Sequence, residues 1–202
     1  MQIPLEVIGL SKIYNNKDAV KDISFKVNKN EIIGILGPNG CGKTTTIGMI
    51  LGLLKPSNGK VLINGIEIEK KRVDLLNHLN FISPYIELPK KLTVKQNLEV
   101  YGRLYDVKNL KKKIEMLSEK LRLSEIINKL TGELSSGQKN RVSLAKSIIN
   151  NPTVLLLDEP TASLDPETGD FVRSFLESYQ KENKASILLA SHNMSEVERL
   201  CS

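Results

Sequence analysis

The sequence of 202 residues predicts an α/β fold: a core with a mostly parallel sheet, an antiparallel β part at the N-terminus and a helical subdomain. Three observations predict it. Residues up to about 70 show strand patterns, residues from about 85 to 152 show helical spacing, and two continuous apolar runs follow Pro152. We therefore expect a single domain, residues 1–202, whose core is formed by about 1–84 and 153–202 and whose helical subdomain is formed by about 85–152.

The N-terminal part is predicted to be β-structure. Ile23, Phe25 and Val27 alternate with polar residues, which is typical of a half-buried strand. In VLINGIEI, Asn64 and Gly65 lie between two short alternating arms, and this dipeptide favours the positive backbone angles of a tight hairpin turn.

The middle of the chain is predicted to be helical. Thr93 and Gln96 have the spacing of a capping box at the start of a helix. Apolar residues then recur at helical intervals in three groups: Val94, Leu98, Tyr101 and Leu104 or Tyr105; Ile114, Leu117 and Leu121; and Val142, Ala145, Ile148 and Ile149.

Strands and helices alternate in the last part. TVLLLDE and ASILLAS each contain a continuous apolar run, as expected for strands buried on both faces of a parallel sheet. Asp165 and Pro166 resemble the N-cap and first position of a helix between them, and NMSEVERLC begins another helix.

Composition and charge exclude several classes of protein. Hydrophobic residues at 40% and charged residues at 26% are typical of a globular domain. We expect no membrane span and no signal peptide, since no long uncharged apolar run and no basic N-terminal region are present. We expect Cys41 and Cys201 to be free thiols in a reducing compartment. The net charge of +6 comes from scattered lysines, and the run Lys111–Lys113 is expected to be a solvated helix face, so we do not expect a nucleic-acid partner.

A glycine-rich loop carries the first chemical signal. The spacing Gly37-x4-Gly42-Lys43-Thr44 matches the P-loop pattern between a strand and a helix. Glycines allow backbone N–H groups to converge on an anion, and the helix beginning at Lys43 would present its free N–H groups to phosphate. Lys43 would reach the β- and γ-phosphates, and the Thr44 hydroxyl would bind Mg²⁺. A plain glycine turn is the simpler alternative, but both flanks favour the phosphate site.

An acidic pair at the end of a buried strand supplies the second signal. In VLLLDE, Asp158 is placed to bind Mg²⁺, and Glu159 is the candidate base that polarises a water for attack on the γ-phosphate. Two solvated carboxylates at a strand end are the alternative, which the presence of a P-loop disfavours.

The pentapeptide LSSGQ, Leu134 to Gln138, points to one specific family of nucleotide-binding proteins. A P-loop followed by this pentapeptide ahead of an acidic strand resembles the ATPase domains of ABC transporters, and the resemblance covers nearly the whole chain. By this resemblance Tyr14 stacks on adenine, Ser163-Leu164-Asp165 forms the D-loop, and His192 contacts the γ-phosphate. Alternatives stay open: Tyr14 as a strand residue, Asp165 as a helix cap and His192 as a structural residue.

The resemblance implies a site and partners. Catalysis would depend on Lys43, Glu159 and His192, and Mg²⁺ on Thr44 and Asp158. The residues expected to bind ATP are Tyr14, Gly37, Pro38, Asn39, Gly40, Cys41, Gly42, Lys43, Thr44, Thr45, Ser135, Gly137, Gln138 and Asp165. Family members work as head-to-tail homodimers or heterodimers with ATP between the P-loop of one and the pentapeptide of the other, attached through integral membrane permease subunits to the cytoplasmic face of the membrane.

Two departures from the family pattern bear on mechanism. The family glutamine that lies about nine residues before the threonine of LTV corresponds here to Pro84, which has no side-chain oxygen for Mg²⁺ or water. Either another group serves, such as Ser83 through a water, or the metal site is looser. The family pattern also continues past ERLC, so we expect the C-terminal strands of the core to be absent here.

Three functions remain open at this stage. The first is ATP hydrolysis that powers a transporter, in the export direction, because the sequence from SPYIELP to VYGRLY resembles exporter ATPases. The second is a soluble ABC-type ATPase that acts on nucleic acid or ribosomes, which usually has a long coiled coil or two ATPase domains. The third is a nucleotide-binding regulator that does not hydrolyse ATP because of Pro84. Cys41 is either a small residue that fits or a thiol that favours the thiolate beside phosphate-binding N–H groups.

Overall fold

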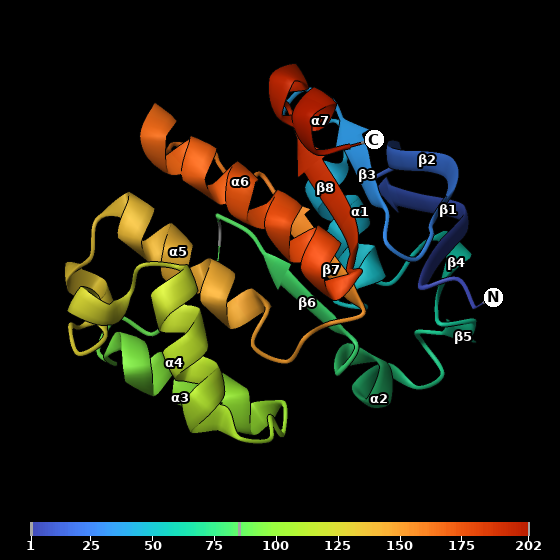
Figure 1. Ribbon diagram of the computed structural model, residues 1–202. Helices are drawn as coiled ribbons and strands as arrows, with labels where there is room; N and C mark the ends of the chain where they lie inside the picture. The colour runs from blue at the N-terminus through green and yellow to red at the C-terminus, as the bar shows by residue number, and fades with distance from the viewer. Residues whose placement is uncertain (1, 85, 202) are drawn as a thin grey trace.

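The computed structural model describes residues 2–84 and 86–201, which form two β-sheets and a set of helices (Figure 1). Figure 1 shows a helical group, formed by residues 94–147, on one side of the molecule, and the strands of residues 5–27 and 58–67 on the opposite side. Within these residues no helix has both the length and the apolar character needed to cross a membrane.

The first sheet is antiparallel and has the strand order β2-β1-β4-β5. Its strands are β1 (Leu5–Tyr14), β2 (Lys17–Val27), β4 (Asn58–Ile63) and β5 (Ile66–Glu67). The turn between β4 and β5 is the predicted hairpin: Asn64 and Gly65 have φ of 50° and 75°, and Ile63 pairs with Ile66. The Asn-Gly prediction is therefore confirmed, because the dipeptide adopts the left-handed backbone that the turn requires.

The second sheet is parallel and has the order β3-β8-β7-β6. Its strands are β3 (Ile32–Leu36), β6 (Leu79–Ile82), β7 (Val154–Asp158) and β8 (Ser186–Ser191). Every residue of β7 and β8 is buried, which explains why both read as continuous apolar runs. The α/β prediction is confirmed, with the parallel and antiparallel strands in separate sheets.

Two hydrophobic cores share the parallel sheet. Leu155 and Leu157 of β7 belong to a core with α6 (Pro166–Asn183) and the helical group, whereas Val154 and Leu156 belong to a core with α1 (Lys43–Ile50) and the antiparallel sheet. Successive residues of a strand point to opposite faces, so one strand serves both cores. Burial of a leucine side chain stabilises the fold by about 2 kcal/mol, and this arrangement fixes β7 between two layers.

The helical group contains α3 (Val94–Leu104), α4 (Leu110–Lys120) and α5 (Ser136–Ser147), with the short 3₁₀ helices Ser124–Ile126 and Thr131–Glu133 between α4 and α5. The predicted capping box of α3 is present, since Gln96 N donates to Thr93 Oγ1 and Thr93 N donates to Gln96 Oε1. Two elements were not predicted from the sequence: the short helix α2 (Arg72–Leu76) and β6. The remaining helix, α7 (Met194–Leu200), follows β8.

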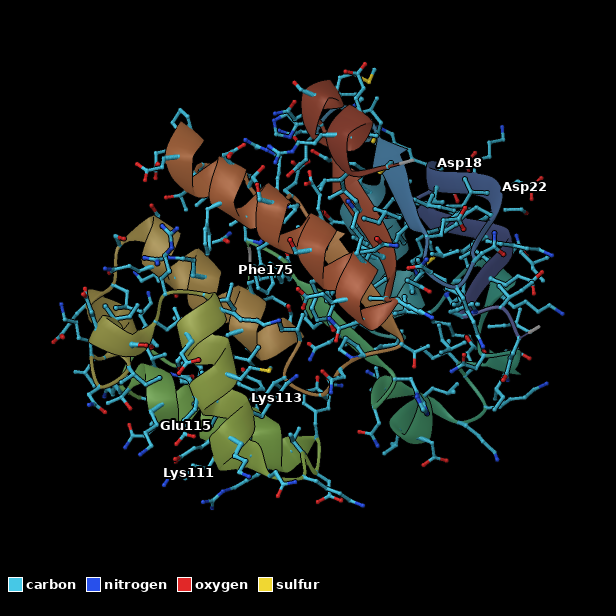
Figure 2. The ribbon with its side chains drawn as sticks, in the orientation of Figure 1. Asp18, Asp22, Lys111, Lys113, Glu115 and Phe175 are labelled. Carbon is cyan, nitrogen blue, oxygen red and sulfur yellow. The ribbon has the colours of Figure 1, made fainter. Side chains whose placement is uncertain are left out.

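One surface prediction is wrong in part. Lys111 and Lys112 are exposed, but Lys113 is half-buried and its Nζ donates to Asn151 Oδ1 at 2.5 Å. Burial lowers the pKa of Lys113 below its ordinary value. Lys113 and Phe175 line one cavity of about 340 Å³ between α4 and α6, where Figure 2 labels both side chains. The lysine run is therefore only partly a solvated face.

Candidate functional site

The carboxyl ends of the four parallel strands meet at one edge of the sheet. β3 leads into the glycine loop, β6 ends before Ser83, β7 ends with Asp158, and β8 ends before His192. Ligands in open α/β folds bind at this edge. The topology thus brings together groups that are far apart in the sequence.

The glycine loop ends where α1 begins. Gly42 is the N-cap of α1 with φ of 99°, and a Cβ there would lie 2.4 Å from the backbone oxygen of Ala19. Only glycine fits this position, because both the backbone angle and the close approach exclude a side chain. A cavity of about 160 Å³ opens here, and its lining residues are Ala19, Asn39, Gly40, Gly42, Lys43, Thr44, Thr45, Asp158 and Glu159. Of these, only Ala19 was not predicted.

Lys43 is buried at the bottom of this cavity with 6% of its surface exposed. Its Nζ donates to the carbonyl oxygens of Gly37 at 2.6 Å and Pro38 at 3.1 Å, and lies 3.4 Å from Glu159 Oε1. The ammonium group is therefore directed at the loop itself. A phosphate in the cavity would offer the same group a stronger, charged acceptor.

Thr44 and Asp158, the two residues predicted to bind Mg²⁺, are in direct contact. The Thr44 hydroxyl donates to Asp158 Oδ2 at 3.0 Å, and Asp158 is 99% buried, since its exposed fraction is 1%. Burial raises the pKa of Asp158, while hydrogen bonds from Thr44 and Ser83 oppose that rise. Among the described residues, Asp158 Oδ1 has no hydrogen-bond partner. A buried carboxylate oxygen beside a hydroxyl suits Mg²⁺, which binds proteins through one or two oxygen ligands.

Ser83 lies beside Asp158. The sequence named Ser83 as one group that could act in place of the family glutamine. The Ser83 hydroxyl donates to Asp158 Oδ2 at 3.4 Å, a long hydrogen bond. Ser83 thus contacts the carboxylate that is predicted to bind Mg²⁺, and it directly precedes Pro84. That Ser83 acts here in place of the glutamine stays a prediction, as does the alternative of a looser metal site.

Glu159 and His192 are in direct contact. His192 Nδ1 lies 2.6 Å from Glu159 Oε2, within hydrogen-bond distance. Glu159 has φ of 50°, a left-handed conformation that is strained for a residue with a side chain. The loop that follows β7, residues 159–165, is called the acidic loop below. The backbone N of Glu159 donates to Ala190 O at 2.8 Å, which fixes the start of the acidic loop on β8.

The pentapeptide LSSGQ lies at the N-terminus of α5. Ser135 is the N-cap: Gln138 N donates to Ser135 Oγ at 3.2 Å, and Ser135 N donates to Gln138 Oε1 at 3.1 Å. These groups do not line the cavity of the glycine loop as the structure describes it. Asn140, which the sequence did not single out, connects α5 to the acidic loop because its Nδ2 donates to Pro160 O at 2.7 Å. No motif signalled Asn140, since the contact joins two elements far apart in the chain.

A second cavity of about 300 Å³ lies between α5 and the acidic loop. Glu159 lines both cavities, so it faces the glycine loop on one side and the helical group on the other. The other residues that line the second cavity are Ile82, Ser83, Pro84, Ile86, Glu87, Leu88, Lys90, Thr131, Ser136, Lys139, Asn140, Ser143, Ala162, Ser163 and Leu164.

Four of the residues predicted to bind ATP do not line the glycine-loop cavity: Tyr14, Cys41, Gly137 and Asp165. Tyr14 is 44% exposed, and the Nζ of Lys12 lies 5.0 Å from the centre of its ring. Asp165 caps α6 by accepting from Thr168 N at 2.9 Å, and this hydrogen bond lowers its pKa. The Cys41 thiol is exposed, and Gly137 packs beside Thr168. The cap confirms the structural interpretation of Asp165, while its part in nucleotide binding stays a prediction.

Fold and site together define a P-loop nucleotide-binding domain, with a glycine loop, a helix N-terminus and an acidic strand end at one sheet edge. The family model described as ABC transporter matches residues 20–162. The chain belongs to this family.

Relatives with names agree with this assignment. The Nod factor export ATP-binding protein I of Rhizobium johnstonii is 39% identical over 202 residues, covering 98% of this chain and 64% of its own length. The chain thus spans less than two thirds of that relative. The ABC transporter ATP-binding protein NatA of Bacillus subtilis is 36% identical over 186 residues, which is 91% of this chain and 75% of that protein.

Solved structures show the same fold. An ATP-binding subunit of an ABC transporter superposes with a TM-score of 0.89 at 27% identity, covering 98% of this chain and 82% of the other. CbiO1 from Clostridium perfringens, described as part of the transporter complex CbiONQ, gives a TM-score of 0.85 at 30% identity, covering 100% of this chain and 83% of the other.

Proposed function

We propose that the chain binds Mg-ATP and hydrolyses it as the ATP-binding subunit of a transporter whose permease subunits lie in the membrane. One observation supports this most directly. The Thr44 hydroxyl and the Asp158 carboxylate meet at 3.0 Å beside the uncapped start of α1, so a cation and a phosphate could be held by adjacent groups. Bound Mg²⁺ would neutralise phosphate charge, and Thr44 and Asp158 are the residues that would hold it.

The chain's own residues have separate tasks in this proposal. Lys43 and the N–H groups at the start of α1 bind the phosphates and offset their charge. Glu159 accepts a proton from the attacking water, and His192 holds the Glu159 carboxylate through the 2.6 Å contact. Tyr14 contributes a ring for adenine, once Lys12 moves away from it.

The partners are part of the same proposal. A second ATPase subunit, identical or different, would close the site head-to-tail with the LSSGQ segment at the start of its α5. The relative named for Nod factor export supports the export direction. Pro84 and Ile86 line the cavity between core and helical group, a place that suits residues that report the ATP state to a permease at the cytoplasmic face of the membrane.

Phosphate release and dimerisation test the proposal together. We expect the parent protein to release phosphate from Mg-ATP, and Glu159→Gln to bind Mg-ATP, release little phosphate and elute as a dimer. Glu119→Gln changes an exposed carboxylate of α4 and is the matched control, which should behave as the parent does. A Glu159→Gln protein that stays monomeric with Mg-ATP would contradict the dimer mechanism.

The regulator hypothesis gives a different result in the same assay. It predicts that the parent binds Mg-ATP without phosphate release, as Pro84 in place of glutamine would allow. Restoring the family residue with Pro84→Gln would then produce phosphate release, whereas in the hydrolysing subunit it changes an existing rate.

A further inference from the structure

Glu196 is a buried acid that the proposed mechanism does not use. It lies on α7, and only 2% of its surface is exposed. A carboxylate at such a position is unfavourable unless hydrogen-bond donors reach it. Glu198 on the same helix is exposed, so a solvated helix face does not explain Glu196. Its partners have to explain its position.

Two hydroxyl groups donate to Glu196, one to each carboxylate oxygen. Thr161 Oγ1 donates to Oε1 at 2.7 Å, and Ser191 Oγ donates to Oε2 at 2.7 Å. Hydrogen bonds of a hydroxyl to an ionised carboxylate are among the strong ones in proteins. Thr161 belongs to the loop after β7, and Ser191 is the last residue of β8. One side chain therefore joins the ends of two neighbouring strands.

The same two strand ends carry Glu159 and His192. Thr161 comes two residues after Glu159, and Ser191 directly precedes His192. The loop after β7 is strained, since Glu159 and Ser163 have φ of 50° and 61°. Backbone in this region persists only when surrounding contacts hold it in place. Glu196 supplies such a contact from the side of the loop that faces α7.

We propose that Glu196 is a positioning residue for ATP hydrolysis. By holding Thr161 and Ser191 it fixes the spacing of the β7 and β8 ends, and so keeps His192 Nδ1 within 2.6 Å of Glu159 Oε2. The inference rests on the proposed hydrolysis, and it adds a residue to that mechanism. Glu196 is not among the residues described as lining the glycine-loop cavity, so it would act on turnover and leave nucleotide binding unchanged.

Steady-state kinetics of three variants test this role. We expect Glu196→Ala to lower kcat for phosphate release about 10- to 100-fold, the range for a misplaced catalytic group, with KM for Mg-ATP within about twofold of the parent. Glu196→Gln should recover part of the rate, since its amide oxygen accepts from one hydroxyl and its NH₂ donates to the other. Glu198→Ala removes an exposed acid from the same helix and should match the parent.

Thr161→Val is a second test of the same contact, which serves if Glu196→Ala fails to fold. Valine keeps the shape of threonine but cannot donate to Glu196, so it should lower kcat with KM unchanged. A kcat of Glu196→Ala and of Thr161→Val equal to that of the parent would overturn the proposal. Equal losses in kcat and in nucleotide affinity would also overturn it, because they indicate a general structural role.

A crystal structure separates this inference from the proposed function. In Glu196→Ala we expect the His192–Glu159 contact to be lost and the loop after β7 to shift, whether or not the parent hydrolyses ATP. If the parent releases no phosphate, the proposed function fails, and the structure alone decides the positioning role. An unchanged His192–Glu159 contact in the variant would refute the role of Glu196 even where the parent is an active ATPase.

Discussion

The N-termini of α1 and α5 carry the two glycine-containing motifs, yet the two helices are capped differently. At α1 the N-cap is Gly42, which has no side chain, so the first N–H groups of the helix keep their capacity for an external acceptor. At α5 a capping box is present, since Ser135 and Gln138 hydrogen-bond each other's backbone N–H groups. The first terminus has no side-chain cap, and the second satisfies two of its backbone donors with its own side chains.

This difference fits the two tasks proposed for them. A site that binds phosphate within its own chain gains from N–H groups that need no rearrangement. A site that meets phosphate only through a partner would spend most of its time without it, and unsatisfied groups there would cost stability. The capping box keeps α5 intact in the single chain, and Ser135 would exchange one hydrogen bond for another on dimerisation. The predictions below test this distinction.

The largest effect is expected at α1. Lys43→Ala removes the cation at the bottom of the glycine-loop cavity, and we expect phosphate release to fall about 100-fold or more, the scale of losing one group that stabilises the transition state. Nucleotide binding, measured by fluorescence of a labelled ATP, should weaken as well. Lys55→Ala removes an exposed lysine and is the control for net charge. Parent-like binding and turnover in Lys43→Ala would show that α1 is not the phosphate site.

Local chemistry explains which parts of the molecule were predictable. The Asn64-Gly65 turn, the Thr93 and Asp165 caps and the start of α1 each depend on residues within a few positions, and all are confirmed. The acidic strand was predictable because burial on both faces leaves a continuous apolar run.

Contacts between distant segments were not predictable. The hydrogen bond of Asn140 to Pro160, the wall formed by Ala19 and the hydrogen bonds of Glu196 join segments that only the tertiary fold brings together. The strand β6 was missed because its sequence, LNFI, has four residues and no strong period. The Ser83–Asp158 hydrogen bond likewise depends on strand order, which single-chain patterns do not specify.

A second effect, of intermediate size, is expected at α5. Ser135→Ala removes the cap, so the free energy of unfolding should fall by about 1 kcal/mol. If α5 also meets the phosphate of a partner, phosphate release should fall about tenfold or more, while ATP binding by the monomer stays at the parent level. Equilibrium urea unfolding and phosphate release, measured on the same preparation, check the two parts.

Thr93→Ala is the matched control for this experiment. Thr93 forms the same kind of capping box at α3 with Gln96, and it is not part of the LSSGQ segment. We expect a similar loss of stability and no loss of phosphate release. Equal losses of activity in the two variants would mean that helix stability, and not contact with a partner's nucleotide, explains the effect at α5.

A smaller effect is expected at Cys41, in the glycine loop. Its thiol is exposed in the loop that is proposed to hold the phosphates, so iodoacetamide should label it, and Mg-ATP should slow that labelling several-fold. Cys201 is the internal control, because burial raises its pKa to about 11 and makes it react slowly with or without nucleotide. Mass spectrometry distinguishes the two sites. Equal labelling of Cys41 with and without Mg-ATP would refute occupancy of the loop by nucleotide.

The last prediction concerns how α5 is attached to the core. Lys146 of α5 is buried, its Nζ donates to Phe81 O at 3.4 Å, and it lies over the rings of Phe81 and Tyr101. Burial lowers the pKa of Lys146 to about 8. Between pH 8 and the ordinary lysine range near 10.5, the unfolded chain therefore holds a proton that the folded protein has released.

The contribution of Lys146 to the free energy of unfolding must therefore rise with pH, because the unfolded state binds more protons between pH 8 and 10.5. Relative to Lys146→Met, the free energy of unfolding of the parent should increase between pH 8 and 10.5 by up to about 3 kcal/mol. Urea unfolding of both proteins across this range measures the difference, in which contributions from Tyr179 and Cys201 cancel. A parallel pH dependence of the two proteins would mean that Lys146 keeps its proton in the fold, held by the aromatic rings of Phe81 and Tyr101, and that α5 is joined to β6 by a permanent cation.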